Sequence, residues 1–143
     1  ANVLDLACGS GEVTLALQAL GAGRVSGIDP YTSEAYRART GLEAEQLTFE
    51  EIAGGALRGR SYSLIVCSFA LHLVAASWLP ALCIELAQIA PCLVAVTPHK
   101  RPELKPAWGW LLEGERLHER VRVRKYARIP NYGVPATCFV KNS

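Results

Sequence analysis

The sequence predicts an α/β fold: a doubly wound, mostly parallel sheet with an antiparallel hairpin at its C-terminal end. Short apolar runs alternate with segments of helical pattern over residues 1–97, which is typical of parallel strands joined by helices. A glycine-rich turn joins the first apolar run to the first helical segment. Beyond residue 120 the apolar residues recur at every second position, as in an antiparallel strand with one exposed face. The length of 143 residues favours a single domain over residues 1–143.

The first strand is predicted over Val3–Leu6 and runs directly into the turn Cys8-Gly9-Ser10-Gly11, after which a helix begins at Glu12. Glycine has no Cβ, so a ligand can lie against the bare backbone of such a turn. The start of the helix adds free N–H groups and a partial positive charge. This element therefore predicts a nucleotide-type binding loop.

A carboxylate inside the first strand identifies the kind of loop. Asp5 interrupts an apolar run, and burying a charge is costly unless a cation or several donors meet it. The dinucleotide-binding fingerprint requires a glycine where this chain has Thr14. The set Asp5, Ala7, Gly9 and Gly11 instead resembles the first motif of the class I, seven-strand, Rossmann-like S-adenosylmethionine-dependent methyltransferases, with Ala7 in place of the first glycine. The resemblance implies that S-adenosyl-L-methionine is the cofactor and that Asp5 lies near its methionine part.

The second strand is expected over Arg24–Asp29, after the segment Gly21-Ala22-Gly23 ends the first helix. Asp29 follows Gly9 by twenty residues, the spacing at which a carboxylate can accept hydrogen bonds from ribose hydroxyls. The resemblance implies the same role for Asp29 and places Pro30 and Tyr31 beside the adenine.

A short third strand is predicted over Gln46–Phe49, near the edge of the sheet. The resemblance implies that Glu51 accepts a hydrogen bond from the adenine amino group while Ile52 covers the ring. Glu50 is the alternative to Glu51 if the register shifts by one residue, and a solvated acid in a loop is an open alternative for either.

The fourth strand, Tyr62–Phe69, ends on Ser68 and Phe69, which the resemblance places against the methionine part of the cofactor and open toward the substrate. The chain lacks the Asn-Pro-Pro-aromatic tetrad of the amino-methylating enzymes of nucleic acids and glutamine, which argues against those substrates. The next helix is expected to begin at a Ser77 cap and to continue through Ala90.

The fifth strand is predicted over Cys92–Thr97, and the segment 99–102 emerges from its carboxyl end, the edge at which ligands bind in open α/β sheets. A further helix is predicted to begin within Trp108–Glu113, with one of its two tryptophans in the core. Strands at residues 120–124 and Ala136–Val140 complete the expected hairpin.

Composition restricts the partners. A formal net charge of +2 favours neither nucleic acid nor a membrane surface, and there is neither a transmembrane-length apolar run nor a basic-then-apolar leader. The five cysteines form no Cys-x-x-Cys pair, which predicts a cytoplasmic, reducing environment and no metal site. A basic cluster is interpreted as a solvated face, with binding of an anionic substrate or RNA as the alternative; its members are Arg116, Arg120, Arg122, Arg124, Lys125 and Arg128. Because the chain begins at a strand, it is expected to be a fragment without the N-terminal helix of the resembled family.

The predicted function is transfer of a methyl group from S-adenosylmethionine to a small-molecule acceptor, whose identity the sequence does not give. His72 and His99 are weak candidates for a catalytic base, a helix cap or a core hydrogen bond being the alternative for each. Two other functions stay open: a methyltransferase-like binding or scaffold module without turnover, and an NAD-dependent oxidoreductase, against which Asp5 and Thr14 argue.

Overall fold

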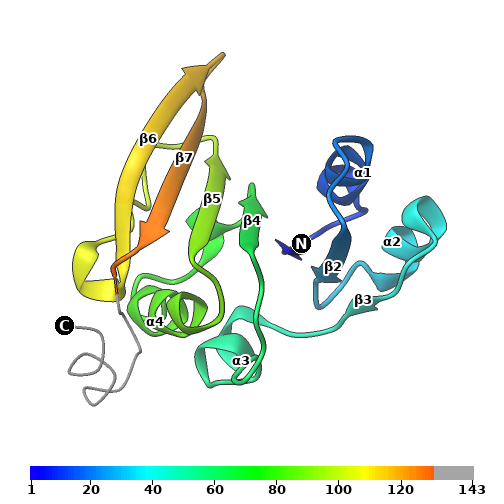
Figure 1. Cartoon of the computed structure of the whole chain (residues 1–143), viewed down its shortest axis with the longest axis horizontal. Coiled ribbons are helices and arrows are strands. Elements are labelled where there is room, and N and C mark those ends of the chain that lie inside the picture. Colours follow the sequence, from blue (N-terminus) through cyan, green and yellow to red (C-terminus); the bar gives the residue numbers. More distant parts are fainter. Residues whose placement is uncertain (131–143) are drawn as a thin grey trace.

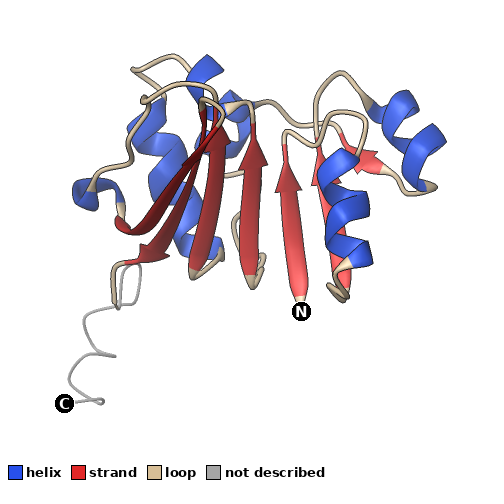
Figure 2. Ribbon diagram, turned by 90° about the horizontal axis from the view of Figure 1, so that it is seen from above, coloured by secondary structure: helices blue, strands red, loops and turns tan. Residues whose placement is uncertain are grey.

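The fold is a single seven-stranded sheet with helices on both faces, as a computed structural model describes it over residues 1–130 (Figures 1 and 2). The strands lie in the order β3-β2-β1-β4-β5-β7-β6. The elements in chain order are β1 (Asn2–Leu6), α1 (Glu12–Ala19), β2 (Arg24–Ile28), α2 (Ser33–Thr40), β3 (Ala44–Glu45), α3 (Phe49–Ala53), β4 (Leu64–Ser68), the 3-10 turn η1 (Leu71–Leu73), α4 (Leu79–Ile89), β5 (Cys92–Thr97), the 3-10 turn η2 (Pro106–Trp108), β6 (Trp110–His118) and β7 (Val121–Arg128).

The directions of the strands confirm the predicted fold class. Strands β1 to β5 pair in parallel, whereas β7 is antiparallel to β5 and β6 is antiparallel to β7. From β1 the chain builds the sheet to one side through β2 and β3, and from β4 it builds to the other side through β5. The order therefore reverses between β1 and β4, and in open α/β sheets such a reversal opens a crevice at the carboxyl ends of the strands.

The two faces of the sheet bury different amounts of apolar surface. The larger cluster packs α3 and α4 against one face and includes the fully buried Leu4, Ile65 and Leu93. The smaller cluster lies under α1 on the other face and is centred on Val3 and Val66. Burial raises the pKa of the Cys67 thiol in this sheet to about 12, so this cysteine is neutral and packs as a small apolar side chain.

The hairpin occurs earlier in the chain than predicted. The helix expected from Trp108–Glu113 is wrong: Trp110 begins β6, and its fully buried indole donates from Nε1 to the carbonyl of Cys83 in α4, at 3.0 Å. Residues 111–118 then form the exposed outer strand of the sheet, so the apolar residues among them are exposed and are not the buried face of a helix. The strand expected over Ala136–Val140 lies outside the described residues.

Two boundaries nearer the N-terminus also differ from prediction. The strand expected over Gln46–Phe49 is wrong, because Thr48 caps α3: its Oγ1 accepts from the Glu51 N–H and the Glu51 carboxylate accepts from the Thr48 N–H. This reciprocal capping box fixes the start of the helix at Phe49. The cap of α4 is Trp78 rather than Ser77, and its helix ends at Ile89.

Of the helices in residues 1–130, none combines the length and the apolar character needed to cross a lipid bilayer.

Candidate functional site: a cleft where the strand order reverses

A cleft of about 450 Å³ opens at the carboxyl ends of β1, β2 and β4, and we call it the switch-point cleft. Its walls include Ala7 and Gly9 after β1, Asp29 and Tyr31 after β2, and Phe69 after β4. The volume falls within the range of about 300–1,000 Å³ that is usual for small-molecule sites. The switch-point cleft is therefore the candidate binding site that the topology predicts.

The loop after β1 presents bare backbone to the cleft. Ala7 and Gly9 both have positive φ, 58° and 56°, a conformation in which glycine is unstrained and alanine is not. A Cβ added to Gly9 would have nothing within 4 Å, so the space beside this residue is open. The N–H and the carbonyl of Gly9 are both bound from the β2–α2 turn, by Asp29 at 3.2 Å and by Thr32 Oγ1 at 2.7 Å. The loop is thus held rigidly while its cleft side stays clear.

The Asp29 carboxylate connects the loop after β1 with the turn after β2. One carboxylate oxygen accepts from the Gly9 N–H and the other from the Tyr31 N–H, at 2.9 Å. Each oxygen has a second lone pair, so Asp29 can still accept hydrogen bonds from a ligand in the cleft. The spacing between Gly9 and Asp29 therefore has a physical origin, because the acid holds the glycine loop as well as facing the cleft.

The lining of the cleft also includes apolar side chains that the sequence did not single out, namely Leu47, Phe49 and Leu73, together with the predicted Ile52. Glu50 lines the cleft, whereas Glu51 does not, because its carboxylate is used in the capping box of α3. The signature of that box, Thr48 followed three residues later by Glu51, was visible in the sequence and would have favoured Glu50.

Asp5 lies below the cleft rather than in its lining. The side chain is 1% exposed; Oδ2 accepts from Thr14 Oγ1 at 2.7 Å, and Oδ1 is buried without a hydrogen-bond partner within residues 1–130. Thr14 Oγ1 also lies 2.9 Å from the hydroxyl of the fully buried Tyr36. Desolvation by burial raises the pKa of Asp5 to about 6, against a weaker opposing effect of the Thr14 hydrogen bond. The carboxyl oxygen without a partner marks a position for a donor or cation supplied from outside these residues.

Gly11 supports the loop from behind. It caps α1 with φ 96°, and an added Cβ would press on the side chains of Tyr36 and Thr40. Gly27 in β2 packs on the same tyrosine, because an added Cβ would lie 2.6 Å from Tyr36 Cζ. These two glycines thus allow a close approach of backbone and ring, whereas Gly9 is open toward the cleft.

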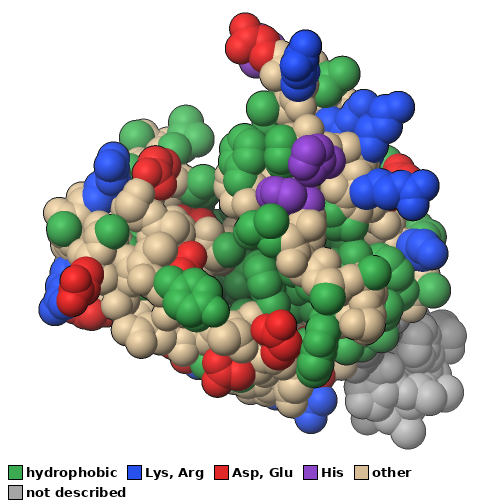
Figure 3. All heavy atoms as spheres, turned by 180° about the vertical axis from the view of Figure 1, so that it is seen from behind, with side chains coloured by type: hydrophobic (Ala, Val, Ile, Leu, Met, Phe, Trp, Pro, Cys, Tyr) green, Lys and Arg blue, Asp and Glu red, His purple; other side chains and the backbone are tan. Residues whose placement is uncertain are grey.

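His72 and His99, the candidate bases, come together from separate strand ends. Their ring centroids are 5.2 Å apart in an edge-to-face arrangement. They do not line the switch-point cleft but a neighbouring cavity, on the other side of the segment 69–74. Figure 3 shows this face of the molecule, where histidine side chains border a hydrophobic hollow with Lys and Arg side chains beside them.

The predicted site residues thus fall into three groups. Those that line the switch-point cleft are Ala7, Gly9, Asp29, Pro30, Tyr31, Ile52, Ser68 and Phe69. Asp5 and Gly11 stand behind its loop, and Glu51 caps α3. The basic cluster is only partly the solvated face that was predicted, since Arg124 is 5% exposed and its Nη1 donates to the backbone carbonyls of Lys100 and Pro102.

Comparison with known proteins shows the family of the chain. The family model described as "Methyltransferase domain" matches residues 3–90, which contain the whole switch-point cleft. An uncharacterized protein of Schizosaccharomyces pombe is 37% identical over 144 residues, an alignment that covers 76% of this chain and 58% of the relative. The chain therefore spans little more than half the length of that relative.

Similar solved structures share the fold. A TehB-like S-adenosylmethionine-dependent methyltransferase from Corynebacterium glutamicum superposes with a TM-score of 0.68 at 15% identity, covering 90% of this chain and 80% of its own. The mitomycin 7-O-methyltransferase MmcR gives a TM-score of 0.71 at 16% identity, covering 90% of this chain and 49% of its own. The magnesium protoporphyrin IX methyltransferase of Synechocystis PCC 6803, whose structure contains S-adenosylmethionine, gives a TM-score of 0.57 at 21% identity, covering 89% of this chain and 69% of its own.

The match over residues 3–90 covers more than half of the chain, and the superpositions extend the likeness of fold over about nine tenths of it. This confirms the resemblance carried by Asp5, Ala7, Gly9 and Gly11. The chain belongs to the methyltransferase domain family and has the fold of the class I S-adenosylmethionine-dependent methyltransferases.

Proposed function

We propose that this chain binds S-adenosylmethionine in the switch-point cleft and transfers its methyl group to a small molecule held in the neighbouring cavity. The observation that carries the proposal is the pairing of the open Gly9 backbone with the Asp29 carboxylate, in a cleft whose lining also includes the apolar Leu47, Phe49 and Ile52. A nucleoside needs these features: an acceptor for its ribose hydroxyls, a close backbone and a flat apolar surface for its base.

The lining suits the parts of the cofactor in order. Asp29 would accept from the ribose hydroxyls, with the lone pairs that Gly9 and Tyr31 leave unused. Ile52 and Phe49 would cover the adenine, and Glu50 stands at that end as an acceptor for its amino group. Asp5, whose Oδ1 has no hydrogen-bond partner within residues 1–130, suits the end of the cofactor that carries the ammonium group.

The reaction requires mainly that the acceptor nucleophile be aligned with the methyl group of the cofactor. S-adenosylmethionine supplies a methyl group that is already electrophilic because it is bonded to a sulfonium. The chain's contribution is to hold a nucleophile in line, about 3 Å from that carbon, and to exclude water. His72 or His99 would take a proton only if the acceptor atom carries one.

A small acceptor is supported by the shape of the site rather than by the fold. The similar structures include both the mitomycin 7-O-methyltransferase and an rRNA methylase from Escherichia coli, so the fold is compatible with either size of substrate. The neighbouring cavity, about 1010 Å³ in volume, is concave and large enough for a drug-sized molecule.

The experiment is calorimetric titration of the chain with S-adenosylmethionine and S-adenosylhomocysteine, comparing wild type with Gly9→Ala. Asp29 is less suitable for mutation, since it also holds the loop. A methyl group at Gly9 would occupy the open space that the cofactor needs, so we expect affinity to fall at least tenfold. The matched control is Gly41→Ala, which has the same kind of strain (φ 74°, nothing within 4 Å) outside the cleft and should bind normally.

Both alanines should lower the free energy of unfolding by a similar amount, about 1 kcal/mol. Equal affinity of Gly9→Ala and wild type would contradict the proposed site, as would tighter binding of NADH than of S-adenosylhomocysteine. Cofactor binding without methyl transfer to any member of a broad acceptor panel would instead support the binding module.

A further inference from the structure

A second cavity lies next to the switch-point cleft, on the far side of the segment 69–74. Phe69, Ala70 and Leu73 face the cleft, whereas His72 and Val74 face this cavity. At about 1010 Å³ it is more than twice the size of the cleft. If the cleft holds the cofactor, as proposed above, an acceptor in the second cavity lies one chain segment away.

The lining of the second cavity combines apolar side chains with two cations. Val74, Leu112 and the half-buried Trp108 supply apolar surface, and Arg101 and Lys105 supply positive charge. The Lys105 ammonium lies over the Trp108 ring, 5.4 Å from its centroid. This combination favours a ligand with a flat apolar body and a charged group.

The positive charges of Arg101 and Lys105 are not neutralised by an ion pair within residues 1–130. Within residues 1–130 the ion pairs are made by other arginines and by Lys125, and neither Arg101 nor Lys105 takes part in one. Glu103 is the carboxylate in the described lining of the cavity. Arg101, Lys105 and Glu103 together carry a net of one positive charge. The lining therefore suits a ligand with a single negative charge.

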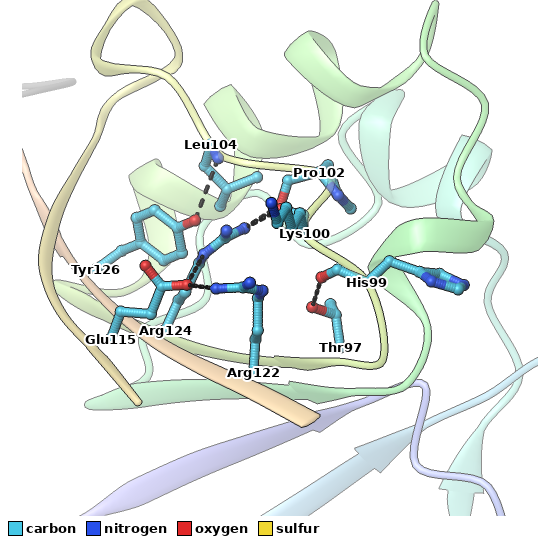
Figure 4. A network of polar contacts seen from close by, with 9 residues as sticks. All are labelled: Thr97, His99, Lys100, Pro102, Leu104, Glu115, Arg122, Arg124 and Tyr126. Carbon is cyan, nitrogen blue, oxygen red and sulfur yellow. Dashed lines mark hydrogen bonds and ion pairs between the residues drawn. The ribbon is translucent and has the colours of Figure 1, made fainter. Parts of the chain in front are cut away.

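The loop that carries these cations is fixed from behind (Figure 4). Thr97 Oγ1 donates to the His99 carbonyl at 2.8 Å. The buried Arg124 guanidinium donates from Nη1 to the Lys100 carbonyl at 2.5 Å and to the Pro102 carbonyl at 3.2 Å. The hydroxyl of the fully buried Tyr126 accepts from the Leu104 N–H at 3.2 Å.

These hydrogen bonds are made by backbone groups of the loop, whereas its Arg101 and Lys105 side chains line the cavity. Arg101 and Lys105 are exposed, while the residues that hold the loop are buried. A ligand would then meet cations whose backbone is already in place, which lowers the entropic cost of binding. The backbone of the loop is therefore held in place, and the two exposed cations project from it beside the cavity.

We propose that the second cavity binds an aromatic monocarboxylate as the methyl acceptor, or an acceptor built around that unit. Arg101 and Lys105 bind the carboxylate, the guanidinium in bidentate geometry. Trp108, Val74 and Leu112 pack against the ring. The His72–His99 pair lies in the same lining, where it can accept a proton from a ring substituent that is methylated.

The test uses a matched pair of probes, 2-naphthoate and the neutral 2-naphthamide, titrated into the chain saturated with S-adenosylhomocysteine. We expect the carboxylate to bind at least tenfold more tightly than the amide. Arg101→Gln and Lys105→Gln should each weaken naphthoate at least fivefold and leave the amide unchanged. The control Arg39→Gln removes an exposed cation on α2 and should change neither affinity.

Three results would overturn the proposal: equal binding of acid and amide, unchanged naphthoate affinity in both glutamine variants, and a single-stranded RNA that binds more tightly than naphthoate and needs Arg101. Titration of S-adenosylhomocysteine alone, in the same variants, separates this proposal from the preceding one. Loss of naphthoate with normal S-adenosylhomocysteine affinity supports the acceptor subsite. Failure of wild type to bind S-adenosylhomocysteine contradicts the cofactor site, whatever naphthoate does.

Discussion

The switch-point cleft and the second cavity are built by different means, although they lie on either side of one chain segment. In the cleft the important groups are backbone, held by short side chains: Gly9 is bound through both its N–H and its carbonyl by Asp29 and Thr32. In the second cavity the important groups are long side chains on a loop, with Arg124 and Tyr126 holding the backbone from the sheet. The first kind of site depends on glycines at fixed places, and the second depends on buried side chains of β7 that hold the loop.

The largest effect that the comparison predicts concerns the glycines behind the cleft. In Gly27→Ala the new Cβ would lie 2.6 Å from Cζ of the fully buried Tyr36, and a buried ring has little room to move. We expect the free energy of unfolding, measured in urea, to fall by about 3 kcal/mol. Gly114→Ala in β6 is the matched change on the other side of the sheet; nothing lies within 4 Å of its added Cβ, so it should stay within about 0.5 kcal/mol of wild type. Equal losses in the two variants would remove the contrast between the regions.

The second prediction concerns the pH dependence that Asp5 gives to the half of the molecule around the cleft. Its pKa is about 6 in the folded chain against 3.8 for the free side chain. Below about pH 4 the carboxyl is protonated in both states and has no effect. Between about pH 4 and pH 6 the unfolded state ionises first, so stability falls as pH rises, by about 3 kcal/mol in all.

Asp5→Asn keeps the shape of the side chain and removes its titration. We therefore expect the free energy of unfolding of this variant, relative to that of wild type, to rise by about 2–3 kcal/mol between pH 4 and pH 7. A difference that stays constant over this range would mean that Asp5 is ionised in the folded chain throughout.

The third prediction separates the two regions through Arg124. Arg124→Met leaves the Lys100 and Pro102 carbonyls without their donor, and we expect a loss of about 2 kcal/mol in the free energy of unfolding. Affinity for naphthoate should fall, because the loop loses its support, while affinity for S-adenosylhomocysteine should not change. Arg122→Met is the control, since Arg122 pairs with the same Glu115 without holding the loop, and it should cost less than about 1 kcal/mol. A fall in the affinity for S-adenosylhomocysteine in Arg124→Met would show that the two regions are coupled.

The same contrast explains which parts of the site could be predicted from the sequence. Gly9 and Asp29 were predictable because their spacing follows from two neighbouring parallel strands, and the structure joins them by a hydrogen bond. Glu51 was assigned to the cleft through the resemblance, with Glu50 as the alternative; Glu51 caps α3, and Glu50 lines the cleft. Arg101 and Lys105 could not be assigned, because their role depends on a loop fold that is set by Arg124 and Tyr126, more than twenty residues away.

The fold shows a similar limit. The parallel strands around β1 and β4 were predicted because each is a buried apolar run that packs on both faces. The residues from Trp108 to Glu113 gave no such signal: Trp110 is fully buried, whereas Leu111 and Leu112 are about 41% exposed on the outer strand. Local pattern could not distinguish this outer strand from a helix, since the burial of Trp110 against α4 is a tertiary contact.

The smallest predicted effect concerns Ala7, where this chain departs from the glycine of the resembled motif. Its φ of 58° strains an alanine by about 1 kcal/mol, but a glycine there would make the unfolded chain more flexible at a cost of nearly the same size. We therefore expect Ala7→Gly to change the free energy of unfolding by less than about 1 kcal/mol. Arg120→Gly, at the β6–β7 turn with φ 72°, should also change the free energy of unfolding by less than about 1 kcal/mol, because it too replaces a strained residue of positive φ by glycine.

Cofactor binding then distinguishes the two positions. Ala7 lines the switch-point cleft and Arg120 does not, so only Ala7→Gly can alter affinity for S-adenosylhomocysteine. Removing the methyl group widens the cleft without removing a hydrogen-bond partner, so affinity should be equal or slightly higher, within about threefold. A large loss would mean that the Ala7 methyl group packs against the cofactor, and the alanine would then be a specific contact of this chain rather than a tolerated replacement for glycine.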